Sequence, residues 1–424
     1  MTGSGSVPPT DVWRVLRRFF LAAAPVVFAV LLVAPARADD CSSVSVPQGL
    51  ERFHAAMEDV EAGERSKPLT VLHLGDSHIS LDTFTRGLRQ RWQARFGDAG
   101  RGLMPGVSFR YYAPDGYDIE MEGAWNIASS LPRDASGPFG IQGFRVSSGD
   151  DDAIISLRSD NPVSAVEIEA YGGPDTGALL LKLGEAAPLK LPTRQAVPGL
   201  VRFRVPAANV HEIRLVPAGT GTVHLLGWAI LSPAKPGVRY DSHGVVAATA
   251  SITTRWDKDA VRAQVAAMNP DLVILGFGTN EGFNNGLDIA AYGAELAGFI
   301  DLLMAAAPGS SLALLGPFDG ARQGAGETCG GGWTTPPKLD AVRSVLANLA
   351  AARGAFFWDG GAAMGGRCSA DEWARAEPPL MYADRVHLRA AGAERLSAQL
   401  WNSLMGLEEN VAESGACHAD DAPD

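Results

Sequence analysis

Two patterns of hydrophobic residues divide the chain. Over most of its length, apolar stripes with helical spacing alternate with short, continuously apolar runs. Such runs between helical segments are typical of buried parallel strands. The sequence therefore predicts an α/β domain, with helices at 47–63, 82–96, 260–268, 289–305, 339–353 and 389–405 and strands at 69–74, 271–275, 311–315 and 355–358.

The block from about residue 105 to residue 236 has a different pattern. Apolar and polar residues alternate there, and Gly, Pro, Asn and Asp interrupt the alternation at short intervals. Regularly spaced short strands separated by turn residues are typical of a β-sandwich. The predicted strands cover 153–157, 165–171, 178–183, 200–205, 211–216 and 222–231.

The N-terminus has the pattern of a secretory signal peptide. Three arginines between positions 14 and 18 precede an apolar run over 19–35, and Ala-Arg-Ala at 36–38 resembles a cleavage site. A retained membrane anchor is the alternative, but the run is short for a bilayer span and contains two prolines. We expect cleavage near Asp39, a periplasmic or secreted protein, and no stable membrane anchor.

These patterns divide the chain into five segments. The signal peptide (1–38) precedes the first part of the α/β domain (39–104), and an all-β sandwich (105–236) interrupts that domain. The second part of the α/β domain (237–406) follows, and the chain ends in an acidic C-terminal tail (407–424).

Charge limits the range of partners. The net charge is −12, and removal of the leader, which carries four Arg and one Asp, would make it −15. Because an acidic chain repels polyanions, we expect no nucleic acid partner. The sequence has no CxxC or HExxH spacing, so we predict no metal site.

Polar residues occur at three places where predicted elements meet. Ser77 follows the first predicted strand, Asn280 follows the 271–275 strand, and Asp384 and His387 precede the last helix. Helix capping or turn formation explains each of them alone. Because the carboxyl ends of parallel strands meet at one edge of a sheet, we expect the residues to converge.

The converging residues match the needs of a serine nucleophile, which requires a base and a group that orients the base. In an Asp-x-x-His turn, Asp384 can accept the Nδ1–H of His387, which leaves Nε2 free to take the proton of Ser77. The amide of Asn280 can donate to a developing oxyanion.

These motifs resemble the blocks of the SGNH (GDSL-type) hydrolase superfamily. GDSH at 75–78, GFGTNE at 276–281 and ADRVHLRAAG at 383–392 resemble three blocks, and residues 240–244 resemble the remaining block, with Gly244 as the match. The resemblance implies an SGNH-type three-layer α/β fold around a parallel sheet, with no cofactor. It assigns Ser77 as nucleophile, His387 as base and Asp384 as its orienting partner. The implied oxyanion hole consists of the Ser77 and Gly244 N–H groups and the Asn280 side chain.

Within the superfamily, the chain resembles the peptidoglycan O-acetylesterases, which carry a β-sandwich insertion between the first and second blocks. Residues 95–106 and 356–369 also resemble that group. This resemblance implies an exported serine esterase that removes O-acetyl groups from cell-wall glycan through an acyl-serine. The sequence leaves open an O-acetyltransferase, an esterase for another acetylated polysaccharide, and a non-catalytic glycan-binding protein.

Neighbouring residues have structural interpretations. We expect His73 to be a core histidine, Asp76 to cap the turn, and His78 to pack or hydrogen-bond beside the site. The four cysteines allow three disulfide pairings that sequence alone does not separate. We favour Cys329 with Cys368 over pairings with Cys41 or Cys417, because both lie in late loops near the expected site.

Overall fold

The computed structural model describes residues 45–107, 112, 114–232, 236–324 and 329–407. The predicted signal peptide, Cys41, and the predicted tail from residue 408 onward, which contains Cys417, lie outside these residues.

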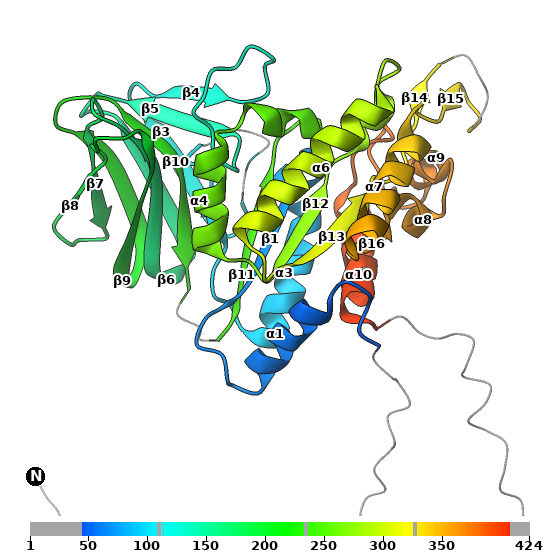
Figure 1. Cartoon of the computed structure of the whole chain (residues 1–424), viewed down its shortest axis with the longest axis horizontal. Coiled ribbons are helices and arrows are strands. Elements are labelled where there is room, and N and C mark those ends of the chain that lie inside the picture. The colour runs from blue at the N-terminus through cyan, green and yellow to red at the C-terminus, as the bar shows by residue number, and fades with distance from the viewer. Residues whose placement is uncertain (1–44, 108–111, 113, 233–235, 325–328, 408–424) are drawn as a thin grey trace, which may run out of the picture. The chain divides into compact units, whose positions relative to one another are not determined.

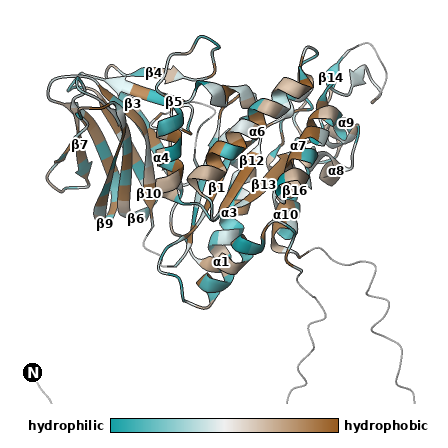
Figure 2. Cartoon of the chain, in the orientation of Figure 1, coloured by the Kyte–Doolittle hydropathy of each residue, from teal (hydrophilic) through white to brown (hydrophobic). Residues whose placement is uncertain are grey.

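A five-stranded parallel sheet forms the centre of the α/β domain (Figure 1). Figure 2 shows that its central strands are continuously hydrophobic, as expected of strands covered on both faces. The apolar runs in the sequence therefore correctly predict the inner strands. The strand order is β11 (Val238–Gly244), β1 (Leu69–Gly75), β12 (Leu272–Gly276), β13 (Ser311–Gly316) and β16 (Phe356–Asp359).

Helices cover both faces of this sheet and complete three layers. Alternate residues of β1 point to opposite faces, so Val71 and Leu72 belong to two different apolar cores. The core of Val71 includes α1 (Glu51–Glu61), α3 (Thr83–Phe96), α8 (Gly360–Met364), α9 (Ser369–Arg375) and α10 (Ala390–Met405). The core of Leu72 includes η1 (Ala250–Arg255), α4 (Lys258–Met268), α6 (Ile289–Ala306) and α7 (Leu339–Arg353). This arrangement confirms the predicted three-layer α/β fold.

One of these helices, α6, is long and apolar enough by composition to span a bilayer. Its residues Leu296, Ile300 and Leu303 are buried in the core beneath the sheet. One face of α6 therefore covers the sheet.

An antiparallel sheet of nine strands forms the insertion, with the strand order β4-β5-β10-β6-β9-β7-β8 and with β2 on β10 and β3 on β6. A core that includes Ile155, Ile168, Leu215 and Trp228 holds it together. This separate sheet agrees with the predicted all-β insertion. Its strands are β2 (Gly102–Met104), β3 (Tyr117–Glu122), β4 (Asn126–Ser129), β5 (Phe144–Ser148), β6 (Ile154–Gly172), β7 (Ala178–Leu183), β8 (Leu189–Pro192), β9 (Gly199–Ala218) and β10 (Val223–Leu231).

Two pairs of predicted short strands are continuous in the structure. Segments 153–157 and 165–171 fall within the long strand β6, apart from residue 153, and segments 200–205 and 211–216 fall within β9. The pairing of these strands shifts register on either side of Val163. The polar and proline residues in this region therefore produce an irregular ladder of the β-bulge type, and the prediction of separate strands was wrong.

A buried ionic network joins the insertion to the edge strand β11. The Arg239 guanidinium donates to Asp241 at 2.8 and 2.9 Å and to Glu167 of β6 at 2.8 Å. Glu167 also accepts from Arg202 and Arg204 of β9 at 2.6 and 3.0 Å. The network therefore fixes the insertion against the strand that ends at Gly244.

We expect Arg239→Ala to lower the free energy of unfolding by about 3–5 kcal/mol, because it leaves the buried carboxylates of Glu167 and Asp241 without their shared partner. Urea denaturation measures the change. Arg262→Ala is the control, because Arg262 and Asp259 form an exposed pair whose loss should cost at most about 1 kcal/mol. Equal losses in the two variants would contradict a stabilising role for the network.

Candidate active site

Ser77 lies in the turn that follows the inner strand β1. Strand β1 ends at Gly75, and Ser77 is the first residue of the short helix α2 (Ser77–Ser80). A Cβ atom at Gly75 would lie 2.5 Å from the carbonyl oxygen of Gly276, so only glycine fits there. Asp76 caps α2 by accepting the His78 N–H at 3.0 Å, as the sequence predicts.

The structure brings His387 and Asp384 to this serine. The Ser77 Oγ lies 3.1 Å from His387 Nε2, and His387 Nδ1 lies 2.8 Å from Asp384 Oδ2. Since the carboxylate can only accept, Nδ1 carries the hydrogen and Nε2 is free to accept the serine proton. The three side chains therefore have the geometry of a Ser–His–Asp triad across 310 residues of sequence.

The Asp384–His387 turn orients the base through its own hydrogen bonds. Asp384 Oδ1 accepts the backbone N–H groups of Val386 and His387 at 3.0 and 3.1 Å. Burial would raise the pKa of Asp384, but these bonds and the one from the His387 ring outweigh it and lower the pKa. The carboxylate is thus held ionised, with one oxygen on the backbone and the other on the imidazole.

The two further residues predicted for the oxyanion hole lie at the ends of the strands that flank β1. Gly244 ends β11, in register with Gly75, and Asn280 lies in α5 (Thr279–Phe283), which follows β12. A Cβ atom at Gly244 would lie 2.2 Å from the Ser80 nitrogen and 2.3 Å from the Asp76 oxygen. Glycine is therefore required for β11 to approach the Ser77 turn. The Asn280 amide is held by a bond from Nδ2 to the Ala248 carbonyl at 2.8 Å.

His78 links the serine turn to the base. Its ring lies 3.3 Å from Asp76 Oδ1 through Nδ1 and 2.9 Å from the Val386 carbonyl through Nε2. Because both partners only accept, the ring must carry both protons to satisfy them. Burial lowers the pKa of His78, but the hydrogen bond and charge of Asp76 outweigh it and raise the pKa. His78 therefore bridges Asp76 and the residue that precedes His387, and Asp76 favours the protonated form of its ring.

His73 is a core histidine, as predicted. Its Nδ1 lies 2.8 Å from the Tyr240 hydroxyl, and its side chain is fully buried. Burial lowers the pKa of His73 to about 3, so the ring is neutral at ordinary pH. Its hydrogen bond links the side chains of β1 and the neighbouring strand β11, and it takes no part in the triad.

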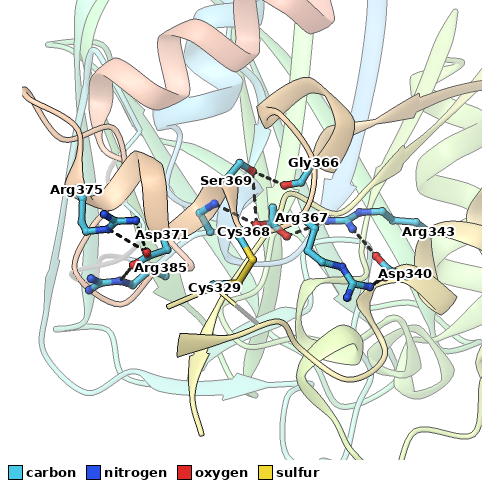
Figure 3. The surroundings of a disulfide bond; sticks show 12 residues. Cys329, Asp340, Arg343, Gly366, Arg367, Cys368, Ser369, Asp371, Arg375 and Arg385 are labelled. Carbon is cyan, nitrogen blue, oxygen red and sulfur yellow. Dashed lines mark hydrogen bonds and ion pairs between the residues drawn. A yellow bond between two sulfur atoms is a disulfide. The ribbon is translucent and has the colours of Figure 1, made fainter. Parts of the chain in front are cut away.

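A disulfide stabilises the loops behind the triad turn (Figure 3). Cys329 and Cys368 are bonded, which confirms the favoured pairing. Arg385, which follows Asp384, pairs with Asp371 at 3.3 Å and stacks 4.0 Å from the centre of the Trp333 ring. The disulfide joins the segment that carries Trp333 to the start of the helix that carries Asp371, so it links the two segments that contact Arg385.

We expect a strong reductant to lower the melting temperature of the protein, because the bond closes a loop of 39 residues. A chain-entropy model gives about 4 kcal/mol for such a loop. Calorimetry with and without reductant measures the effect. In a Cys329→Ser, Cys368→Ser variant, which lacks the bond, reductant should leave the melting temperature unchanged. An unchanged melting temperature of the wild type would contradict the prediction.

Sequence reasoning missed several residues around the site. Glu281, directly after Asn280, is almost fully buried, and its carboxyl group accepts the Ala250 N–H at 2.6 Å. Phe318 packs edge-on against His78 with ring centroids 4.9 Å apart. Its position directly after Asn280 in the GFGTNE motif was the signal available for Glu281. No local signal pointed to Phe318.

A cluster with metal-ligand spacing lies elsewhere. Among the described residues, only Asp150, Asp151 and Asp152 bring their carboxylates close enough to share an ion, and all three are exposed in the insertion. Exposed acidic groups commonly occur together without an ion.

Comparisons with known proteins agree with this fold. Residues 218–395 match the GDSL-like lipase/acylhydrolase family model. This match contains Gly244, Asn280, Asp384 and His387, whereas Ser77 precedes it because the insertion separates the first block from the others.

A solved structure shows the same architecture over most of the chain. A peptidoglycan O-acetylesterase superposes with a TM-score of 0.71 at 23% identity, over 84% of this chain and 95% of that one. A family two carbohydrate esterase from Clostridium thermocellum, solved with cellohexaose, matches 67% of this chain and 100% of that one, with a TM-score of 0.29 and 12% identity. No curated protein matches the chain in sequence.

The triad geometry and the family-model match over residues 218–395 make the chain similar to the SGNH (GDSL-type) hydrolases. The protein is a serine esterase whose α/β domain is interrupted by an antiparallel β insertion.

Proposed function

We propose that the protein is an exported esterase that removes O-acetyl groups from cell-wall peptidoglycan through an acetyl-Ser77 intermediate. The arrangement of Ser77, His387 and Asp384 is the observation that carries the chemistry. The substrate class is supported by the structural likeness to a peptidoglycan O-acetylesterase over 84% of the chain. Export is supported by the signal-peptide pattern of residues 1–38.

In the first half of the reaction, Ser77 Oγ attacks the acetyl carbonyl carbon while His387 Nε2 takes the hydroxyl proton. The negative charge that forms on the carbonyl oxygen is stabilised by the Ser77 and Gly244 N–H groups and by the second amide hydrogen of Asn280. Collapse of the tetrahedral intermediate breaks the bond to the sugar oxygen. That oxygen leaves with the proton held by His387, and the acetyl group stays on Ser77.

In the second half, water replaces the sugar. His387 Nε2 removes a proton from the water as its oxygen attacks the acetyl carbonyl, and collapse returns that proton to Ser77 Oγ as acetate leaves. A transferase would use the same acetyl-serine but a sugar hydroxyl in place of water. The fate of the acetyl group therefore separates the two activities.

The test is the release of acetate from O-acetylated peptidoglycan by the purified mature protein. We expect free acetate in proportion to the acetyl groups removed, and slower release from acetylated xylan. Peptidoglycan stripped of its esters by mild base is the control for the substrate, and Ser77→Ala is the control for the enzyme. Acetate release from acetylated xylan alone would contradict the proposed substrate, and acetyl groups recovered on other sugars would identify a transferase.

A further inference from the structure

Glu281 is a buried carboxyl group that the triad chemistry does not use. Its residue is 1% exposed, directly beside Asn280 in α5. One carboxyl oxygen, Oε1, accepts the Ala250 N–H at 2.6 Å. The other, Oε2, is buried without a hydrogen-bond partner among the residues that the structure describes. An incompletely satisfied buried carboxyl group lowers stability, so its position next to Asn280 requires an explanation.

Asn280 and Glu281 hold the same backbone segment at two points. Asn280 Nδ2 donates to the Ala248 carbonyl at 2.8 Å, and Glu281 Oε1 accepts from the Ala250 nitrogen two residues further on. This segment, residues 245–250, begins directly after Gly244, and its Val245 nitrogen donates to the Gly75 carbonyl at 3.2 Å. It therefore connects the glycine of the oxyanion hole, the turn before Ser77 and the Asn280 amide.

We propose that Glu281 is a positioning residue for the oxyanion hole: its carboxyl group fixes the 245–250 segment and thereby holds the Gly244 N–H and the Asn280 amide around the ester oxygen. This inference rests on the proposed esterase function. Glu281 touches neither Ser77 nor the substrate, and it acts through the backbone at Ala250 and through its neighbour in α5.

The carboxyl group of Glu281 keeps its proton up to a pH of about 7. Burial raises the pKa of Glu281 to about 7, although the Ala250 N–H acts to lower it. The titratable groups that act on it are Asp76, whose charge raises its pKa further, and Tyr292 of α6, whose own pKa burial raises. The folded state therefore keeps this proton where the unfolded chain, with a pKa of 4.5, has lost it. Stability supplied by this group falls as the pH rises from about 4.5 to about 7.

The experiment measures kcat and KM of two variants on a small activated acetyl ester, 4-nitrophenyl acetate. We expect Glu281→Ala to lower kcat by about 10-fold to 100-fold with little change in KM, because loss of an entire oxyanion donor costs ~10²–10³-fold. Glu281→Gln keeps an oxygen for the Ala250 N–H and should restore most of kcat. Glu281→Ala should cause a smaller loss in an Asn280→Ala background than in the wild type, because part of its effect passes through the Asn280 amide.

The matched control is Glu169→Gln. Glu169 is a buried carboxyl group with a raised pKa in the insertion, where Gln264 donates to it at 2.7 Å, and its replacement should leave kcat unchanged. Wild-type kcat in Glu281→Ala, a loss confined to KM, or full additivity with Asn280→Ala would overturn the inference while the esterase assignment stands. A wild type without activity on the ester would remove the proposed function itself.

Glu281→Gln decides the question if Glu281→Ala does not fold. The wild type should lose kcat relative to this variant as the pH rises above about 7, because only its carboxyl group ionises there. Between about pH 5 and pH 8, which spans the pKa of Glu281, the melting temperature of the wild type should fall more steeply than that of Glu281→Gln. Parallel profiles of both quantities would overturn the proposal.

Discussion

Ser77→Ala should reduce kcat on a simple acetyl ester by about 10⁶-fold while the protein keeps its fold. Removal of the nucleophile of a serine hydrolase has an effect of this size, because the remaining groups act as a unit around the missing atom. Ser77 is 5% exposed, and its hydroxyl makes its side-chain bond with His387. The substitution therefore removes one oxygen and leaves the packing of α2 intact. Ester hydrolysis, with circular dichroism as a check of folding, measures the effect.

Ser80→Ala is the matched control for this prediction. Ser80 is also buried in α2, but its hydroxyl donates to the Ser77 carbonyl at 3.1 Å and does not bond to the base. We expect it to retain most of the activity. If Ser77→Ala were as active as Ser80→Ala, Ser77 would not be the nucleophile.

Asp384→Asn should lower kcat by about 10⁴-fold, because it reverses the tautomer of His387. Asp384 Oδ1 accepts two backbone N–H groups, so the single oxygen of asparagine would take that place. Its NH₂ group would then face His387 Nδ1, where the carboxylate oxygen now lies at 2.8 Å. A donor there requires Nδ1 to accept, which places the ring hydrogen on Nε2, where it prevents removal of the Ser77 proton. Steady-state kinetics on the same ester measures the loss.

Asp340→Asn controls for a change of charge alone. Asp340 is an exposed carboxylate of α7 that pairs with Arg343 and Arg367. We expect its kcat to equal that of the wild type. If Asp384→Asn lost as little kcat as Asp340→Asn, the charge of Asp384 would not be needed to set the tautomer of His387.

The α/β domain was largely predictable because its signals are local. The runs at 69–74 and 271–275 are continuously apolar because both faces of β1 and β12 are covered. The edge strand β11 lacked that signal. Its residues Arg239 and Asp241 alternate with Val238 and Tyr240, and the charges are buried because the insertion supplies Glu167 opposite them. The sequence alone does not indicate the contact with Glu167, so it does not predict a buried strand at Val238–Gly244.

Within the candidate site, the sequence predicted the residues that belong to short motifs at the ends of predicted strands and helices. Each of these residues follows or precedes a recognisable element: Ser77, Asn280, Asp384 and His387. In the structure, His387 lies within hydrogen-bonding distance of Ser77 on one side and of Asp384 on the other. The supporting contacts were not predictable in this way. The bond from His78 to the Val386 carbonyl joins residues 308 positions apart, and nothing near either residue indicates it.

Direct observation of the acetylated residue tests whether Ser77 is the nucleophile. Acid quenching of the wild-type enzyme during turnover of 4-nitrophenyl acetate, followed by proteolysis and mass spectrometry, locates the acetyl group. We expect acetylation of Ser77 in the wild type, none in Ser77→Ala and less in Asp384→Asn. Acetyl groups recovered on a different residue, at a rate that supports turnover, would contradict it.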